Sequence, residues 1–76
     1  MNMVAPGPVP PWRQIHADLV RQIESAELPP GSRLPSIVTL AQTYEVATTT
    51  VRKALDALKE AGLVVTSPMG TFVAQR

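Results

Sequence analysis

Apolar side chains recur at spacings of three and four residues near the start of the chain. They are Trp12, Ile15, Leu19 and Ile23. This spacing aligns side chains on one face of a helix, so the pattern predicts an amphipathic helix from about Pro11 to about Ala26. Proline is tolerated in a first turn, because its missing N–H would have no partner within the helix. Residues 28–32 contain two adjacent prolines, which end the helix.

A second helix follows a short extended segment at residues 33–35. Pro35 restricts the residue before it to extended geometry, and Ser36 is suited to cap a helix by accepting from a free backbone N–H. The helix is predicted over Ile37–Tyr44. Its inner stripe consists of Ile37, Leu40, Ala41 and Tyr44. Residues 45–47 leave room only for a tight turn before the next helix.

A third helix is predicted from about Thr48 to about Ala61, and Gly62 ends it in a left-handed conformation. Its core face consists of Val51, Ala54, Leu55 and Leu58. At about 100° per residue, Thr48, Arg52 and Lys59 fall within about 40° of one another on an exposed face. Thr49 and Asp56 lie beside them, and Lys53 points further round the helix.

The hydrophobic period changes after Gly62. Residues 63–66 and 71–74 are strand candidates, and residues 67–70 form a turn cluster. Together they predict a β-hairpin with a four-residue connection. Phe72 and Val73 alternate, so one faces the core and the other the outside. The chain is therefore predicted to have an α+β fold with three helices and a small antiparallel β-hairpin.

The first eleven residues differ from the rest. They hold four prolines and one glycine, which favour a flexible, partly extended arm. This stretch has no arginine, which argues against an arm that binds the minor groove of DNA. We therefore divide the chain into an arm at residues 1–11 and one folded domain at residues 12–76.

Composition excludes several classes of protein. The chain has 76 residues, a net charge of +1, no cysteine and one histidine. Disulfide scaffolds, thiolate metal sites and multi-histidine sites are therefore ruled out, and no glycine-rich phosphate loop is present. We expect no enzyme activity, no cofactor and no metal. No apolar run is long enough to span a membrane, and no signal peptide is evident, so we expect a cytoplasmic, nucleoid-associated protein.

Helix, tight turn, helix, glycine and hairpin follow one another in the order of a winged helix-turn-helix. In such folds the second helix of the pair enters the major groove of DNA. The cation and hydroxyls at the start of helix 48–61 suit phosphates and base edges. The alternative is an ordinary solvated helix face, since Asp56 and Glu60 weaken its positive charge.

Five short segments carry a resemblance to a known family. They are residues 12–15, 28–36, 49–55, 60–64 and 70–74. In this order and spacing they resemble the N-terminal DNA-binding domain of GntR-family bacterial transcription regulators. The resemblance covers residues 12–74 and implies a winged helix-turn-helix that binds a short, partly palindromic operator in double-stranded DNA.

The resemblance also implies roles for individual residues. Arg52 would contact DNA, Thr49 and Thr50 would contact phosphates or bases, and Gly70 at the wing tip would approach the minor groove. Phosphate contacts are expected from the basic side chains Arg33, Arg52, Lys53 and Lys59. Ser36 and Thr48 complete the set of candidate DNA-binding residues.

Departures from the family pattern predict an altered operator and weaker affinity per monomer. Ile37 and Val38 stand where the family usually has Glu-Arg, which removes one DNA-contacting charge and, we expect, the capping-box partner of Ser36. Ala47 replaces a common serine and is a poor N-cap unless Thr48 takes over. Thr48 itself replaces an arginine, and Pro68 stiffens the wing tip.

The function predicted from these observations is sequence-specific DNA binding in transcription control, more in keeping with a repressor than an activator. The main alternative is a winged-helix module that binds protein and has lost or weakened DNA binding. Family members normally carry a larger C-terminal domain that binds an effector and forms the dimer. In this chain we expect no small-molecule effector site and at most a weak homodimer. Trp12 is expected to pack the first helix onto the hairpin, and Tyr44 to pack in the core with its hydroxyl at the rim.

Overall fold

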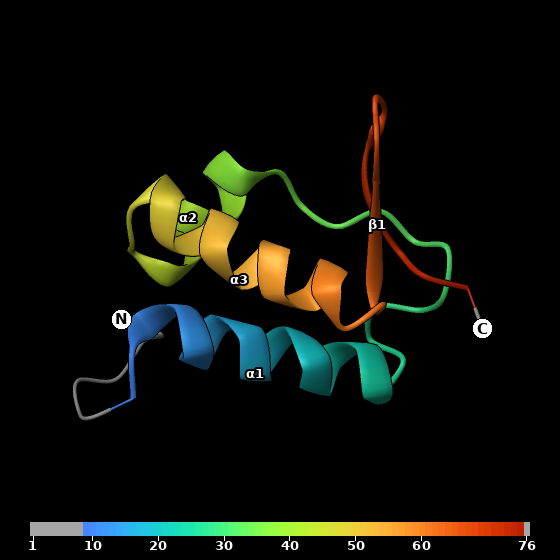
Figure 1. Ribbon diagram of the computed structural model, residues 1–76, viewed down its shortest axis with the longest axis horizontal. Coiled ribbons are helices and arrows are strands. Elements are labelled where there is room, and N and C mark those ends of the chain that lie inside the picture. Colours follow the sequence, from blue (N-terminus) through green and yellow to red (C-terminus); the bar gives the residue numbers. More distant parts are fainter. Residues whose placement is uncertain (1–8, 76) are drawn as a thin grey trace.

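Residues 9–75 are described by the computed structural model, and they form three helices and one antiparallel hairpin. The elements are α1 (Pro11–Glu24), α2 (Ile37–Tyr44), α3 (Thr48–Glu60), β1 (Val64–Ser67) and β2 (Gly70–Val73). α1 lies alongside α3, and the hairpin stands at the C-terminal end of α3 and projects away from the helices (Figure 1). The predicted order of elements is confirmed. Most of the predicted proline-rich arm lies outside the described residues.

The first helix ends two residues earlier than predicted. The backbone at Ala26 is left-handed, with φ of 65°, and the Leu28 N–H donates to the Gln22 carbonyl at 3.1 Å. Bonds of this kind satisfy carbonyls that the last turn of a helix leaves open. The chain has therefore already left the helix before it reaches the two prolines.

The bounds of α2 are as predicted, and α3 ends one residue early. Gly62 has φ of 77°. Its N–H donates to the Lys59 carbonyl at 3.0 Å, and the Leu63 N–H donates to the Leu58 carbonyl at 3.0 Å. This pair of bonds is the left-handed helix ending that favours glycine. The predicted role of Gly62 is confirmed.

The turn between α2 and α3 is tight, as predicted. It is formed at Glu45, which is left-handed with φ of 59°. The Val46 N–H then donates to the Ala41 carbonyl at 3.0 Å. Ala47 follows as the N-cap of α3 and makes no side-chain capping bond. Thr48 does not replace it in that role, so the predicted weak cap is confirmed.

The hairpin connection has two residues, not the predicted four. Ser67 pairs with Gly70, so only Pro68 and Met69 lie outside the ladder. The Ser67 hydroxyl accepts from the Met69 N–H at 3.1 Å, which closes the turn locally. Val73 is buried while Phe72 is only partly covered, as the predicted alternation requires.

A further segment extends the sheet beyond the hairpin. Arg33 forms an antiparallel bridge with Phe72. The Leu34 N–H donates to the Thr71 carbonyl at 2.8 Å, and the Val73 N–H donates to the Ser32 carbonyl at 2.8 Å. The extended segment before α2 is thereby fixed along the outer edge of β2, which holds the start of α2 next to the hairpin.

The core lies between the three helices and the base of the hairpin. Its buried side chains are Ile15, Leu19, Leu34, Leu40, Ala41, Tyr44, Val51, Ala54, Leu55, Leu58, Val64 and Val73. The predicted core face of α3 is entirely buried. On the stripes of α1 and α2, Trp12, Ile23 and Ile37 are only partly buried.

The prediction that Trp12 packs against the hairpin is wrong. Trp12 lies at the N-terminal end of α1, and the hairpin lies beyond the other end of that helix (Figure 1). Its ring contacts α3 instead, where the Lys53 Nζ lies 5.1 Å from the ring centroid. The error arose because the apolar stripe gives the face of α1 that is buried, but not the position along the neighbouring elements that each residue meets.

Candidate nucleic-acid interface

The exposed face of α3 begins beside the buried Leu55. At about 100° per residue, Thr48, Lys59 and Arg52 follow Leu55 round the helix within about 60°. All three are exposed, while Thr50 on the opposite flank is partly covered. The structure therefore keeps these three predicted residues together on one open flank.

Lys53 lies on the other flank, toward α1. Its ammonium group and the Arg13 guanidinium are 5.1 and 5.7 Å from the centroid of the Trp12 ring. A cation over an indole face is attracted by the negative charge of that face. Lys53 is therefore turned about 100–120° round the helix from Arg52 and Lys59, and its predicted contact with DNA stays a prediction.

The basic side chains differ in whether they are neutralised. Arg21 on α1 forms ion pairs with Asp18 and Glu27. Within residues 9–75, Arg33, Arg52 and Lys59 form none. Asp56 and Glu60 are also exposed on α3, so the positive charge of this flank is moderate. Arg33, Arg52 and Lys59, three of the four cations predicted to contact phosphates, are therefore not neutralised by any described carboxylate.

The start of α2 lies at the edge of the same surface. The Ser36 hydroxyl accepts from the Thr39 N–H at 3.1 Å, which confirms its predicted capping role. The expectation that Ile37 removes a capping-box partner is wrong, because that partner belongs at the third helical position, which is Thr39. The Thr39 hydroxyl itself lies 2.9 Å from that of Ser36. Val38, the next residue after Ile37, is 59% exposed.

A groove of about 270 Å³ runs between the start of α2 and the hairpin. It is lined by Arg33, Leu34, Pro35, Ser36, Ile37, Val38, Leu55, Gly70 and Thr71. Three predicted site residues, Arg33, Ser36 and Gly70, thus share one hollow with Leu55 of α3. The wing and the start of α2 thus border this groove together with Leu55, the residue next to the exposed flank of α3.

The orientation of α2 depends on a polar contact with α1. The Tyr44 hydroxyl donates to the Asp18 carboxylate, which also accepts from Arg21 and Gln22. Partial burial raises the pKa of Asp18, but the hydrogen bonds from Tyr44 and Arg21 outweigh it and hold that pKa below its ordinary value. Burial and the bond to Asp18 both raise the pKa of the Tyr44 phenol. The predicted place of the Tyr44 hydroxyl at the rim of the core is confirmed.

Comparison with known proteins identifies the fold and the family. The sequence pattern described as "Bacterial regulatory proteins, gntR family" matches residues 11–73. The chain belongs to the GntR family. Its members and relatives are transcription regulators rather than enzymes, in agreement with the sequence prediction. By family and fold, the chain is a winged helix-turn-helix DNA-binding domain of the GntR type.

Individual GntR relatives cover the described chain well. The HTH-type transcriptional repressor NagR of Bacillus subtilis is 37% identical over 76 residues, which are 99% of this chain and 31% of NagR. The structure of YtrA from Sulfolobus acidocaldarius, a GntR-family transcription factor, has a TM-score of 0.87 at 33% identity, covering 92% of this chain and 74% of that one. The DNA-binding domain of AraR in complex with operator ORX1 has a TM-score of 0.87 at 29% identity and covers 92% of both chains. The chain spans 19% to 55% of the lengths of the curated relatives that it matches.

Two residues near the groove, Thr39 and Thr71, are not among the DNA-binding residues predicted from the sequence. Thr39 was overlooked, although the spacing Ser36-x-x-Thr39 resembles a capping box with a hydroxyl in place of a carboxylate. Thr71 lines the groove beside Gly70, and the only signal for it was its place after the turn. Neither residue type is specific enough to be found without knowing which segments meet.

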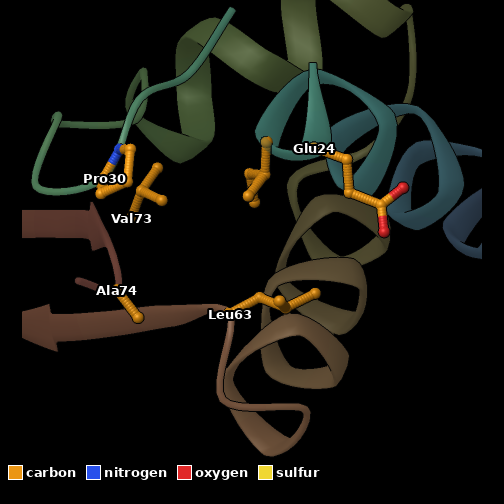
Figure 2. A pocket seen from close by; sticks show the side chains of 6 residues that line it. Glu24, Pro30, Leu63, Val73 and Ala74 are labelled. Carbon is orange, nitrogen blue, oxygen red and sulfur yellow. The ribbon is translucent and has the colours of Figure 1, made fainter. Parts of the chain in front are cut away.

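A second hollow of about 180 Å³ lies near the C-terminal end of α1 and the end of β2. Figure 2 shows Pro30 and Val73 on one side of it and Leu63 on the other. Its lining is apolar apart from Glu24 and includes no basic side chain. This composition is unsuited to phosphate, so the two hollows differ in the ligands that they favour. Among the described residues, no helix is long and apolar enough to cross a membrane.

Proposed function

We propose that the chain is the sequence-specific DNA-binding part of a transcription repressor and that it binds a short, partly palindromic operator. Helix α3 enters the major groove with its N-terminal residues at the base edges, and the hairpin acts as the wing. The observation that carries this proposal is the open flank of α3, where Thr48, Arg52 and Lys59 lie together without ion pairs among the described residues.

Two relatives support the proposal. The AraR domain, which resembles this chain over 92% of both, was solved in complex with operators, among them ORX1 and ORE1. NagR, of which this chain covers 31%, is named a repressor. The AraR comparison concerns a DNA-binding domain, which is the role proposed for this chain.

Each candidate residue other than Arg33 receives a role in the proposed complex. Thr48, Thr49, Thr50 and Arg52 lie at the N-terminal half of α3 and meet base edges and phosphates. Ser36 and Lys59 contact the backbone, and Gly70 allows the wing to approach the minor groove closely. The position of Lys53 over Trp12 makes it the weakest of the proposed phosphate contacts.

The proposed target has two half-sites. Two copies of the domain bind the palindrome with the half-site spacing fixed by the DNA helix, and their contact with each other is weak. We propose that the protein works in the cytoplasm, in association with the nucleoid.

The test is fluorescence anisotropy on a duplex selected by this chain from a random pool, measured beside a scrambled duplex at two salt concentrations. We expect Arg52→Ala to weaken binding to the selected duplex about tenfold or more, because a good base contact contributes about 1–3 kcal/mol of discrimination. Arg21→Ala is the matched control, since Arg21 is an ion-paired arginine on α1. Circular dichroism verifies that both variants fold.

Equal losses for Arg52→Ala and Arg21→Ala would contradict the proposed orientation of α3. If the folded chain enriches no duplex even at low salt, the proposal of DNA binding fails. That result would favour a module that binds protein, in which the exposed acidic residues Asp56 and Glu60 contact the partner.

A further inference from the structure

The Arg33 side chain lies directly against the wing glycine. A Cβ atom built on Gly70 would be 2.8 Å from Arg33 Nε and 3.3 Å from both Cζ and Nη2. Real Cβ atoms essentially never approach another atom to less than 3.0 Å. The guanidinium group of Arg33 therefore occupies the space that any other residue at position 70 would fill.

The backbone holds Arg33 in this place. It bridges to Phe72 in β2, and the next residue donates its N–H to the Thr71 carbonyl at 2.8 Å. Leu34 is buried in the core. Since successive side chains of an extended segment point to opposite sides, burial of Leu34 directs Arg33 outward.

The charge on Arg33 is uncompensated within residues 9–75. It is exposed and forms no ion pair there. It also lines the groove that connects Gly70 with Ser36 and with Leu55 of α3. Its guanidinium lies against Gly70 at the wing tip, and this places it to follow the wing toward the minor groove that adjoins the helix proposed to enter the major groove.

We propose that Arg33 enters the minor groove together with the wing and selects A·T-rich sequence there. This differs from the phosphate contact predicted from the sequence, and it rests on the proposed DNA-binding function. A·T-rich tracts have a narrow minor groove whose enhanced negative potential attracts arginine. Their floor also lacks the 2-amino group that every G·C pair places in that groove. Arg33 is thus a specificity-determining residue.

Gly70 is the positioning residue for Arg33. Its φ of 131° lies in the region that side chains rarely adopt, and its missing side chain leaves the space that the guanidinium occupies. A substitution at Gly70 would push Arg33 away from the wing without removing its charge. If such a variant loses the A·T preference although Arg33 keeps its charge, then the position of the Arg33 guanidinium, and not its charge alone, produces the preference.

The experiment uses the duplex selected by the wild-type chain. Adenines are replaced by 2,6-diaminopurine in one short block at a time, which adds an amino group to the minor groove and leaves the major-groove edge unchanged. We expect one flanking block to weaken wild-type binding about tenfold. In Arg33→Ala the same block should weaken binding less than about twofold. Arg52→Ala, whose contact lies in the major groove, should keep the full wild-type penalty and serves as the matched control.

Gly70→Ala is expected to lose the block-specific penalty as Arg33→Ala does. An unchanged penalty in Arg33→Ala would overturn the inference while leaving operator binding intact. If Arg33→Ala instead weakens binding equally on all duplexes and reduces the salt slope by about one, Arg33 contacts a phosphate and the inference is overturned. If the wild-type chain enriches no duplex, the proposed function fails first and the inference falls with it.

Discussion

The Tyr44 hydroxyl donates a hydrogen bond to the Asp18 carboxylate at 2.5 Å, and this contact joins α2 to α1 across 26 residues of sequence. The ring of Tyr44 is buried in the core, with 4% of the residue exposed. Asp18 also accepts from Gln22 and Arg21 on its own helix. Because α3 is packed between these helices and the hairpin, the contact helps to set the angle at which the proposed recognition surface is presented.

Removing the Tyr44 hydroxyl should destabilise the domain while preserving its packing. Tyr44→Phe keeps the ring but loses the bond to Asp18, and we expect the free energy of unfolding to fall by about 1–2 kcal/mol. Urea denaturation followed by circular dichroism measures the change. Thr43→Val is the matched control, because it removes an exposed hydroxyl that bonds only within α2. A loss in Tyr44→Phe no larger than in Thr43→Val would contradict the structural role of the contact.

Asp18 should make stability depend on pH at the acidic end. Its pKa in the folded protein lies below the ordinary 3.8, so its contribution is fully present above about that pH and is lost as pH falls through the folded value. We expect the stability gap between the wild type and Asp18→Asn to narrow below about pH 4. Urea midpoints from neutral to acidic pH measure this gap. A constant gap over the whole range would show that the carboxylate charge contributes nothing.

Much of the fold could be predicted because the hydrophobic spacing is regular. The core face of α3, which contains Val51 and Leu58, is buried as the period requires. Ser36 caps the start of α2 and Gly62 ends α3 in a left-handed conformation, and both residues lie where expected because their types have specific backbone roles. Local chemistry was sufficient at these positions.

The errors have two causes, which are turns whose residue types give no clear signal and contacts between segments far apart in the sequence. The hairpin turn is shortened to two residues by the pairing of Ser67 with Gly70, which no local pattern specifies. Ala26 and Glu45 adopt left-handed conformations without being glycine, so composition gave no sign of either turn. Trp12 meets Lys53 of α3 only because α1 crosses that end of the molecule.

The candidate site was predicted as a set of residues but not as an arrangement. Arg33 and Gly70 were named separately, and their contact follows from the bridge between Arg33 and Phe72. The helical period could place Arg52 with Lys59, but it could not say which flank of α3 would be covered by α1. That information resides in the packing of α1 on α3.

The N-cap of α3 is a place where stability can be raised. Ala47 makes no side-chain capping bond, so Ala47→Ser should add about 1 kcal/mol to the free energy of unfolding. The opposite kind of change at the N-cap of α2, Ser36→Ala, removes the bond to the Thr39 N–H. It should lower the free energy of unfolding by about the same amount. Urea denaturation compares the two variants. Equal stability of Ala47→Ser and the wild type would mean that the first turn of α3 already has its donors satisfied.

The two lysines on α3 should differ in their contribution to DNA binding. Lys59 lies on the open flank with Arg52, whereas Lys53 is directed toward Trp12. We expect the logarithm of the binding constant to fall with the logarithm of salt concentration at a slope of about −2 per monomer, from two phosphate contacts at about 0.9 each. These contacts are expected from Arg52 and Lys59, since Arg33 is assigned to the minor groove.

Lys59→Gln should therefore reduce the size of this slope by about one, and Lys53→Gln should leave it close to the wild-type value. Both variants remove one positive charge from the same helix, so the net charge of the protein changes equally. Anisotropy titrations at several salt concentrations on one duplex give the slopes. Equal reductions in the two variants would mean that Lys53 leaves the Trp12 ring to reach a phosphate, and that DNA covers both flanks of α3.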